Sequence, residues 1–264
     1  MIQPALKAFT NKVKEKGLFL ALYYTACFVF EIPYRRLWLE PVRRSFSQAR
    51  EDLLLERALG VKISERKGFY IDIGACDPHE LSNTKRFYEK GWTGINVEPN
   101  KLSHARFLKA RPSDLNLNVG VGLQPGELVF YVMNPASLST FSEEKAKENE
   151  KLGYQITSRE SVEVITLTDL FQRHVGDRVV DFMSIDAEGL DVSVLEGNDW
   201  SRWRPKAICI EAGDITNRSL IPDRINKITE FMSRIRYRQF ATVQLYGTPL
   251  NMIFVANELP PQAG

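Results

Sequence analysis

The sequence lacks several features that would assign it to a broad class at once. Its 264 residues include three cysteines without a Cys-x-x-Cys pair, which argues against a disulfide framework or zinc site and favours reduced thiols in a cytoplasmic protein. The 35 basic and 33 acidic residues nearly cancel to a net charge of +2, so we expect no nucleic-acid partner. No internal repeat is present. The length and the 44% hydrophobic content suit one large globular domain with an appendage.

A hydrophobic run long enough to cross a bilayer is also missing near the N-terminus. The uncharged run over residues 18–30 has 13 residues, whereas a span needs about 20. It ends without a small-residue cleavage site, so a signal peptide fits poorly. Basic residues flank the run, and two interpretations of residues 1–44 stay open. The segment is either a helix buried against the domain or a partner subunit, or an amphipathic element at the periphery of an anionic membrane.

Beyond residue 44 the sequence alternates between apolar strands and helices. Predicted strands cover 69–73, 93–97, 115–121, 127–133, 162–167, 179–185, 206–210, 237–245 and 252–256, and predicted helices cover 45–60, 77–90, 101–110, 142–152, 190–195 and 225–235. Such alternation predicts an α/β domain over 45–264, with a doubly wound, mostly parallel sheet. The last two strands predict a terminal antiparallel hairpin.

The helix predicted over 77–90 has clear end signals. Asp77 can be its N-cap, Pro78 its first residue and Glu80 the partner in a capping box. Gly91 is a natural C-terminal stop.

Carboxylates stand at the ends of four predicted strands. They are Asp72, Glu98, the pair Asp186 and Glu188, and Glu211. In a doubly wound sheet, ligands bind beyond the carboxyl ends of the strands, near the point where the strand order reverses. A single acid at such an edge is commonly just solvated, but four acidic strand ends together favour a ligand site.

The spacing of the first two acidic strand ends indicates an adenosine cofactor. Glu98 follows Gly74 by 98 − 74 = 24 residues, with a helix between them. In this arrangement an acid at the end of the second strand binds the ribose hydroxyls, although NAD and S-adenosylmethionine (SAM) both fit it. The loop after Gly74 lacks the G-x-G-x-x-G pattern, and Asp77 and Glu80 would repel a diphosphate. A cofactor with a sulfonium and an ammonium and without phosphates is therefore favoured, which is SAM.

Several blocks of the sequence resemble, in order, the FkbM family of SAM-dependent methyltransferases. They are 72–75 (Asp-Ile-Gly-Ala), 81–84 (Leu-Ser-Asn-Thr), 90–100, 137–140 (Ser-Leu-Ser-Thr), 164–169 and 184–197, preceded by a lead-in at 47–52 (Ser-Gln-Ala-Arg-Glu-Asp). The resemblance covers about residues 45–256. It implies a Rossmann-like class I methyltransferase fold with seven strands and O-methylation, often of sugar hydroxyls in polysaccharides, lipid-linked glycans or natural products. The chain departs from the family at 76–78 (Cys-Asp-Pro), where most members have Asn-x-Gly.

The predicted cofactor site combines strand ends and loops. Asp72 is expected to orient the ammonium of SAM, directly or through water, and Gly74 permits a close backbone approach. The alternative is a helix-capping acid beside a turn glycine. Residues 82–84 either cap a helix or contact the cofactor. The full predicted set is Asp72, Gly74, Ala75, Ser82, Asn83, Thr84, Glu98, Pro99, Asn100 and Asp186.

The predicted catalytic residues are Asp186, Glu188 and Glu211. A base that takes the proton of an acceptor hydroxyl accelerates transfer about 10²–10⁴-fold, and Asp186 and Glu188 are best placed for this role. Glu211 could shift a pKa by like-charge repulsion or complete an oxygen-ligand site for a divalent cation such as Mg²⁺. A base without metal, metal assistance and a purely structural pair all stay open.

Two functions from different classes follow from these residues. The first is an enzyme that methylates a hydroxyl of a glycan, glycolipid or small molecule. The second is a non-catalytic SAM-binding or scaffold protein that acts through its N-terminal segment. We expect residues 134–159 and 216–222 to line the acceptor pocket.

Overall fold

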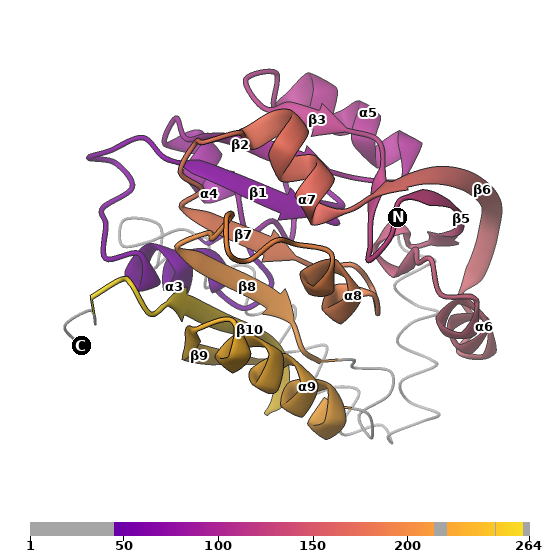
Figure 1. The fold of residues 1–264 in the computed structure, drawn as a ribbon. Coiled ribbons are helices and arrows are strands. Elements are labelled where there is room, and N and C mark those ends of the chain that lie inside the picture. The colour runs from indigo at the N-terminus through magenta and orange to yellow at the C-terminus, as the bar shows by residue number, and fades with distance from the viewer. Residues whose placement is uncertain (1–44, 214–220, 246, 261–264) are drawn as a thin grey trace, which may run out of the picture. The chain divides into compact units, whose positions relative to one another are not determined.

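The computed structural model describes residues 45–213, 221–245 and 247–260 (Figure 1). The N-terminal segment 1–44 and residues 216–220 of the predicted acceptor loop lie outside these ranges. Among the described helices, none is both long and apolar enough to cross a membrane.

A seven-stranded sheet forms the centre of the described domain (Figure 1). In spatial order its strands are β3 (Leu115–Leu117), β2 (Thr93–Val97), β1 (Phe69–Ile73), β7 (Phe182–Ile185), β8 (Ala207–Glu211), β10 (Thr248–Ala256) and β9 (Tyr237–Leu245). The β10 strand runs antiparallel to both of its neighbours, while the first five strands are parallel. The predicted doubly wound, mostly parallel sheet with a C-terminal hairpin is confirmed. The returning strand of the hairpin is inserted between β8 and β9 rather than placed at the edge.

Helices cover both faces of the sheet because the central strands are apolar on both sides. All five residues of β1 are buried, as expected for a parallel strand between two helical layers. Its odd-numbered residues pack in one core with α8 (Asp191–Glu196) and α9 (Ile221–Arg234). Tyr70, on the opposite face, packs in a second core with α3 (Glu51–Ala58) and α4 (Lys85–Glu89).

A second, three-stranded sheet corrects the prediction of one continuous strand over 115–121. The segment divides into β3, in the large sheet, and β4 (Gly120–Val121), which pairs with β6 (Gln155–Ile165). The β5 strand (Gly126–Asn134) pairs antiparallel with β6. The strand predicted at 162–167 therefore begins earlier, at Gln155. The added residues are largely polar, so the hydrophobicity pattern did not predict them. The helix α6 (Glu143–Lys151) lies between β5 and β6 in the chain.

Two predicted helices are shorter than expected. The helix predicted over 45–60 begins only at Glu51, because the side chain of Asp52 accepts hydrogen bonds from the 45–47 segment and wraps it into a turn. The helix predicted over 77–90 is limited to α4. Asp77 does accept hydrogen bonds from the amides of residues 79 and 80, but Leu81 then adopts φ 54°, which ends the turn before a helix forms.

The helices α5 (Lys101–Ala110) and α7 (Leu167–Leu170) complete the regular structure, together with a π-helical turn (Phe171–Val175) and a 3₁₀ turn (Ala136–Leu138). The α5 helix matches its predicted bounds. The short α7 and the turn after it were not predicted, because four or five residues carry too little periodicity.

A buried arginine holds the loop before α4 against the sheet. Arg111 is 1% exposed and donates hydrogen bonds to Thr84 Oγ1 at 2.6 Å, Ser82 Oγ at 2.8 Å and the Pro78 carbonyl at 3.0 Å. Thr84 Oγ1 in turn donates to Asp72 at 2.6 Å. A buried cation with several acceptors is costly to remove, because its partners remain in the core without a donor.

We expect Arg111→Met to lower the free energy of unfolding by about 3–5 kcal/mol, because it leaves buried acceptors and the carboxylate of Asp72 uncompensated. Urea denaturation followed by circular dichroism measures this loss. Lys109→Met, at an exposed position of the preceding helix, is the control and should change stability by less than about 0.5 kcal/mol. Equal stabilities of the two variants would contradict a structural role for Arg111.

Candidate functional site

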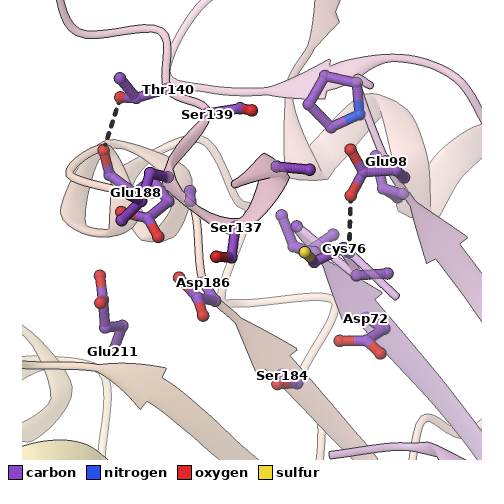
Figure 2. A pocket seen from close by; sticks show the side chains of 18 of the residues that line it. Asp72, Cys76, Glu98, Ser137, Ser139, Thr140, Ser184, Asp186, Glu188 and Glu211 are labelled. Atoms are coloured by element: carbon purple, nitrogen blue, oxygen red, sulfur yellow. Dashed lines mark hydrogen bonds between the residues drawn. The ribbon is translucent and has the colours of Figure 1, made fainter. Parts of the chain in front are cut away.

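A pocket of the described domain lies where the strand order reverses, beyond the carboxyl ends of β1, β2, β7 and β8 (Figure 2). It is a cavity of about 240 Å³. Residues 136–141, which follow β5, form the opposite wall. The pocket therefore lies between the large sheet and the smaller one, at the place where doubly wound sheets bind ligands.

A glycine turn closes the bottom of this pocket. Gly74 has φ 73°, and its amide donates to the Val97 carbonyl at 3.0 Å. A Cβ at this position would lie 1.8 Å from the backbone oxygen of Asp186. Only glycine allows the β1 and β7 loops to approach so closely.

Glu98 is buried at the end of β2 and holds the turn from the other side. Its Oε2 accepts from the Cys76 amide at 2.7 Å (Figure 2). Its Oε1 accepts from the Asn100 amide at 2.7 Å. Each carboxylate oxygen can still accept a further hydrogen bond from a ligand. Burial raises the pKa of Glu98 to about 7, against the two amide hydrogen bonds, which lower it.

The residues of the 81–84 block divide between pocket and scaffold. Ser82 and Asn83 line the pocket together with Asp72, whereas Thr84 does not and instead links Asp72 to Arg111. Burial raises the pKa of Asp72, and the hydrogen bond from Thr84 opposes this shift. The amide nitrogen of Asn83 donates to the Ser184 hydroxyl at 3.0 Å, which ties the block to β7.

The remaining predicted cofactor residues also divide in this way. Ala75 and Pro99 line the pocket. Asn100 does not, because its side chain caps α5 and accepts from the amides of Leu102 and Ser103. Its backbone amide contributes indirectly by fixing Glu98.

Cys76, the first residue of the departure from the family pattern at 76–78, holds the turn through its backbone. Cys76 has φ 56°, in the left-handed region, and its amide is the donor that holds Glu98. Burial, together with the charges of Glu98 and Asp186, raises the pKa of the Cys76 thiol. The thiol therefore stays protonated at neutral pH. Cys76 contributes to the turn through its backbone amide rather than through its side chain.

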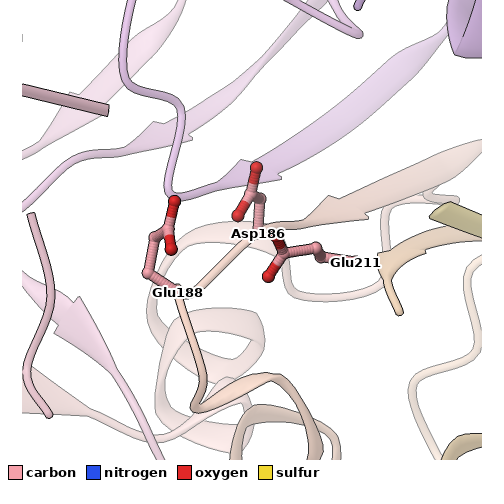
Figure 3. A group of neighbouring side chains, drawn as sticks. All are labelled: Asp186, Glu188 and Glu211. Atoms are coloured by element: carbon pink, nitrogen blue, oxygen red, sulfur yellow. The ribbon is translucent and has the colours of Figure 1, made fainter. Parts of the chain in front are cut away.

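Asp186, Glu188 and Glu211 converge at the other end of the pocket (Figure 3). Each offers an oxygen atom, and these oxygens all lie within 4.8 Å of one another. Asp186 is exposed to the open pocket. Desolvation by the surrounding protein, with repulsion from Glu188 and Asp191, raises the pKa of Asp186 well above its ordinary value. The pKa of Glu211 is also raised, first by desolvation and then by repulsion from Asp186.

Two cations reach the acidic cluster from distant helices, and the sequence did not identify either. Lys145 of α6 pairs with Glu188 Oε2 at 2.6 Å. Arg224 of α9 donates to Glu211 Oε2 at 2.9 Å and also pairs with Asp191. Both lie in charged helices where surface lysines and arginines are common, so the sequence held no signal that could have identified them.

The sequence did not predict a role for Thr140 either, although this residue lies in the 137–140 block that resembles the family. Its hydroxyl donates to the Glu188 carbonyl at 2.9 Å (Figure 2). Residues 136–141, with Lys145 and Asn149, line the pocket, so the structure brings part of the predicted 134–159 acceptor region into the site.

The strand order of the sheet, with one reversed strand before the last, and the pocket at its switch point define a class I methyltransferase. The sequence matches the family model described as "Methyltransferase FkbM domain" over residues 72–239. The chain belongs to the FkbM family of methyltransferases, which implies SAM as its methyl donor. A comparison with curated protein sequences finds no match.

Several solved methyltransferase structures are distantly similar. The methyltransferase domain of METTL16 has a TM-score of 0.47 at 11% identity, over 81% of this chain and 70% of that one. A TehB-like SAM-dependent methyltransferase from Corynebacterium glutamicum has 0.41 at 10%, over 86% and 98%. Precorrin-6y C5,15-methyltransferase from Geobacter metallireducens has 0.39 at 10%, over 81% and 92%.

We expect Gly74→Ala to abolish SAM binding, because the new methyl group cannot fit against the Asp186 carbonyl. Gly153→Ala is the matched control, since Gly153 also has a positive φ of 94° but has nothing within 4 Å of the added carbon. The control should cost about 1–2 kcal/mol of stability and leave SAM binding unchanged. Isothermal titration calorimetry with SAM, beside urea denaturation, separates the two effects. SAM binding by Gly74→Ala at wild-type affinity would show that the close approach is unnecessary.

Proposed function

We propose that the protein transfers a methyl group from SAM to a hydroxyl of a sugar, in a glycan, a glycolipid or a related natural product. The observation that carries the proposal is the position of the Asp186 carboxylate, which shares one pocket with Glu98 and the Gly74 turn. A group suited to accept a proton thus lies beside the groups suited to hold the methyl donor. The resemblance to the family, whose members often methylate sugars, supports the acceptor class.

The chemistry of the lining fits SAM. Bound SAM supplies an electrophilic methyl group on a sulfonium. We assign Glu98 to the ribose hydroxyls, and Asp72 to the ammonium, directly or through water. Val97, Val119 and Val121 add an apolar part of the lining that suits a purine ring. The acidic character of the pocket matches a cofactor with two positive centres.

Asp186 is our candidate for the general base. A sugar hydroxyl is weakly acidic, and proton removal in the transition state helps only if the base has an adequate proton affinity. Desolvation and the neighbouring acids raise the pKa of Asp186, which makes the ionised carboxylate a stronger base than a solvated aspartate. The pocket would hold the acceptor oxygen in line with the transferred methyl group, and this alignment accounts for a further part of the rate.

The binding half of the proposal predicts a loss of SAM affinity in Glu98→Gln. Loss of charged hydrogen-bond acceptors should weaken SAM binding about 10- to 100-fold. The pH dependence has a defined sign. Because the pKa of Glu98 is raised to about 7, wild-type affinity should fall as the pH drops through about 7, and the fall should be absent in Glu98→Gln. Calorimetry between pH 5.5 and 8.5 tests this. The same pH dependence in both proteins would exclude Glu98 as the titrating ligand.

The catalytic half predicts that Asp186→Asn binds SAM within about tenfold of wild type but transfers methyl groups about 10²–10⁴-fold more slowly. Transfer can be followed with [methyl-³H]SAM and a probe panel of hexoses and deoxyhexoses, free and linked to nucleoside diphosphates. Asp177→Asn, at a fully exposed acid, is the control and should keep the wild-type rate. Undiminished transfer by Asp186→Asn would refute the base assignment. SAM binding without transfer to any member of the panel would favour the non-catalytic alternative.

A further inference from the structure

The three acids at the end of the pocket differ in their partners. One oxygen of Glu188 forms an ion pair with the Lys145 ammonium at 2.6 Å, and one oxygen of Glu211 accepts a hydrogen bond from the Arg224 guanidinium at 2.9 Å. Within the described residues, the side chain of Asp186 makes no hydrogen bond or ion pair. All three acids line the pocket, but two of them are paired with positive charges and Asp186 is not.

This donor set does not suit a divalent cation as it stands. Magnesium and calcium ions are held by several oxygen ligands, commonly carboxylates, carbonyls and waters. In this cluster, an ion bound between the three carboxylates would have an ammonium and a guanidinium as close neighbours of its ligands. Repulsion between like charges in a partly desolvated site opposes this arrangement. The positive charge that a metal ion would supply is already present in the side chains.

Lys145 is positioned by more than its charge. Its side chain is only 12% exposed, and it approaches Glu188 from α6, a helix of the segment that separates β5 from β6. The same segment contributes Thr140, whose hydroxyl holds the Glu188 carbonyl. Glu188 has φ 49°, a left-handed conformation that a non-glycine residue keeps only when its surroundings hold it there. Two contacts from one segment therefore fix the backbone and the side chain of Glu188 together.

Arg224 has the corresponding position on the other side of the cluster. It reaches from α9 and joins Glu211, at the end of β8, to Asp191, the first residue of α8. Asp191 in turn accepts from the amide of Ala187 at 2.8 Å, so the arginine also stabilises the loop that follows Asp186.

We propose that Lys145 and Arg224 are positioning residues that take the place of a divalent cation in the acidic cluster. Lys145 holds Glu188 on one side of the cluster, and Arg224 holds Glu211 on the other. Asp186 is left open to the acceptor hydroxyl, so that methyl transfer proceeds without an added metal ion. The role of Asp186 as base rests on the proposed function. The replacement of a metal by two side chains does not, because it concerns the binding properties of the cluster alone.

Manganese binding tests the inference without any acceptor. Mn²⁺ is titrated into the full-length protein and followed by electron paramagnetic resonance of the free ion. We expect wild type to bind Mn²⁺ with a Kd above about 1 mM. Lys145→Met removes the ammonium but keeps the length of the side chain, and should bind Mn²⁺ at least tenfold more tightly. The double variant Lys145→Met with Glu188→Gln should lose this gain, because it lacks the carboxylate that was released.

The controls separate a local charge effect from a structural one. Lys147→Met removes an exposed lysine of the same helix, paired with Glu143, and should behave as wild type. Lys145→Arg restores the positive charge and should bind Mn²⁺ as weakly as wild type. Thermal unfolding of each variant shows whether it is folded, and Lys145→Gln provides a second neutral substitution if Lys145→Met is not.

Methyl transfer to the sugar panel gives an independent readout. Wild-type transfer should be unchanged by EDTA. In Lys145→Met, kcat should fall at least tenfold with little change in the KM for SAM, and Lys145→Arg should recover most of it. The inference is overturned if wild type binds Mn²⁺ tightly, if EDTA stops wild-type transfer in a way that Mg²⁺ reverses, or if Lys145→Met binds Mn²⁺ no better than wild type. A failure of the sugar panel affects only the proposed acceptor and leaves the Mn²⁺ result decisive.

Discussion

The contact between the Gly74 turn and the Asp186 carbonyl is the constraint on which the site depends. It is possible because Gly74 has no side chain and adopts a positive φ. Through this contact the end of β1, which would hold the methyl donor, lies against the end of β7, which carries the acidic pair. Glu98 secures the arrangement from β2 by binding the amide of Cys76. The proposed cofactor half and the proposed catalytic half of the pocket are therefore joined by direct contacts.

Burial creates the electrostatic character of the pocket. The same desolvation raises the pKa of Glu98 at the proposed ribose site and of Asp186 at the proposed catalytic site. Their surroundings then separate the two roles. Glu98 is held by two backbone amides, as suits a fixed binding group, whereas Asp186 faces the pocket between partnered acids. A buried acidic pocket is costly in the free protein, and a cationic cofactor offsets part of that cost on binding.

The smaller sheet connects fold and function. The β5 and β6 strands do not pair with the central sheet. The segment between them nevertheless supplies the pocket wall at 136–141 and the two residues that hold Glu188. From the sequence we expected residues 134–159 to line the acceptor pocket. The structure shows that this region also supports the acidic cluster, because Thr140 and Lys145 contact the loop after β7.

The amino-acid sequence by itself determined the large sheet and the acids at its strand ends. Apolar runs bounded by glycine or acidic residues are local signals, so β1, β2 and α5 agree with their predicted bounds. Local signals failed where a distant partner decides the outcome. The capping residues at 77–80 form their turn, but the contact of Ser82 with the 45–47 segment and the left-handed Leu81 prevent a helix. Only the tertiary structure decided which charges meet: Lys145 and Glu188 are far apart in sequence, as are Arg111 and Thr84, and their interaction depends on the order in which the strands pair.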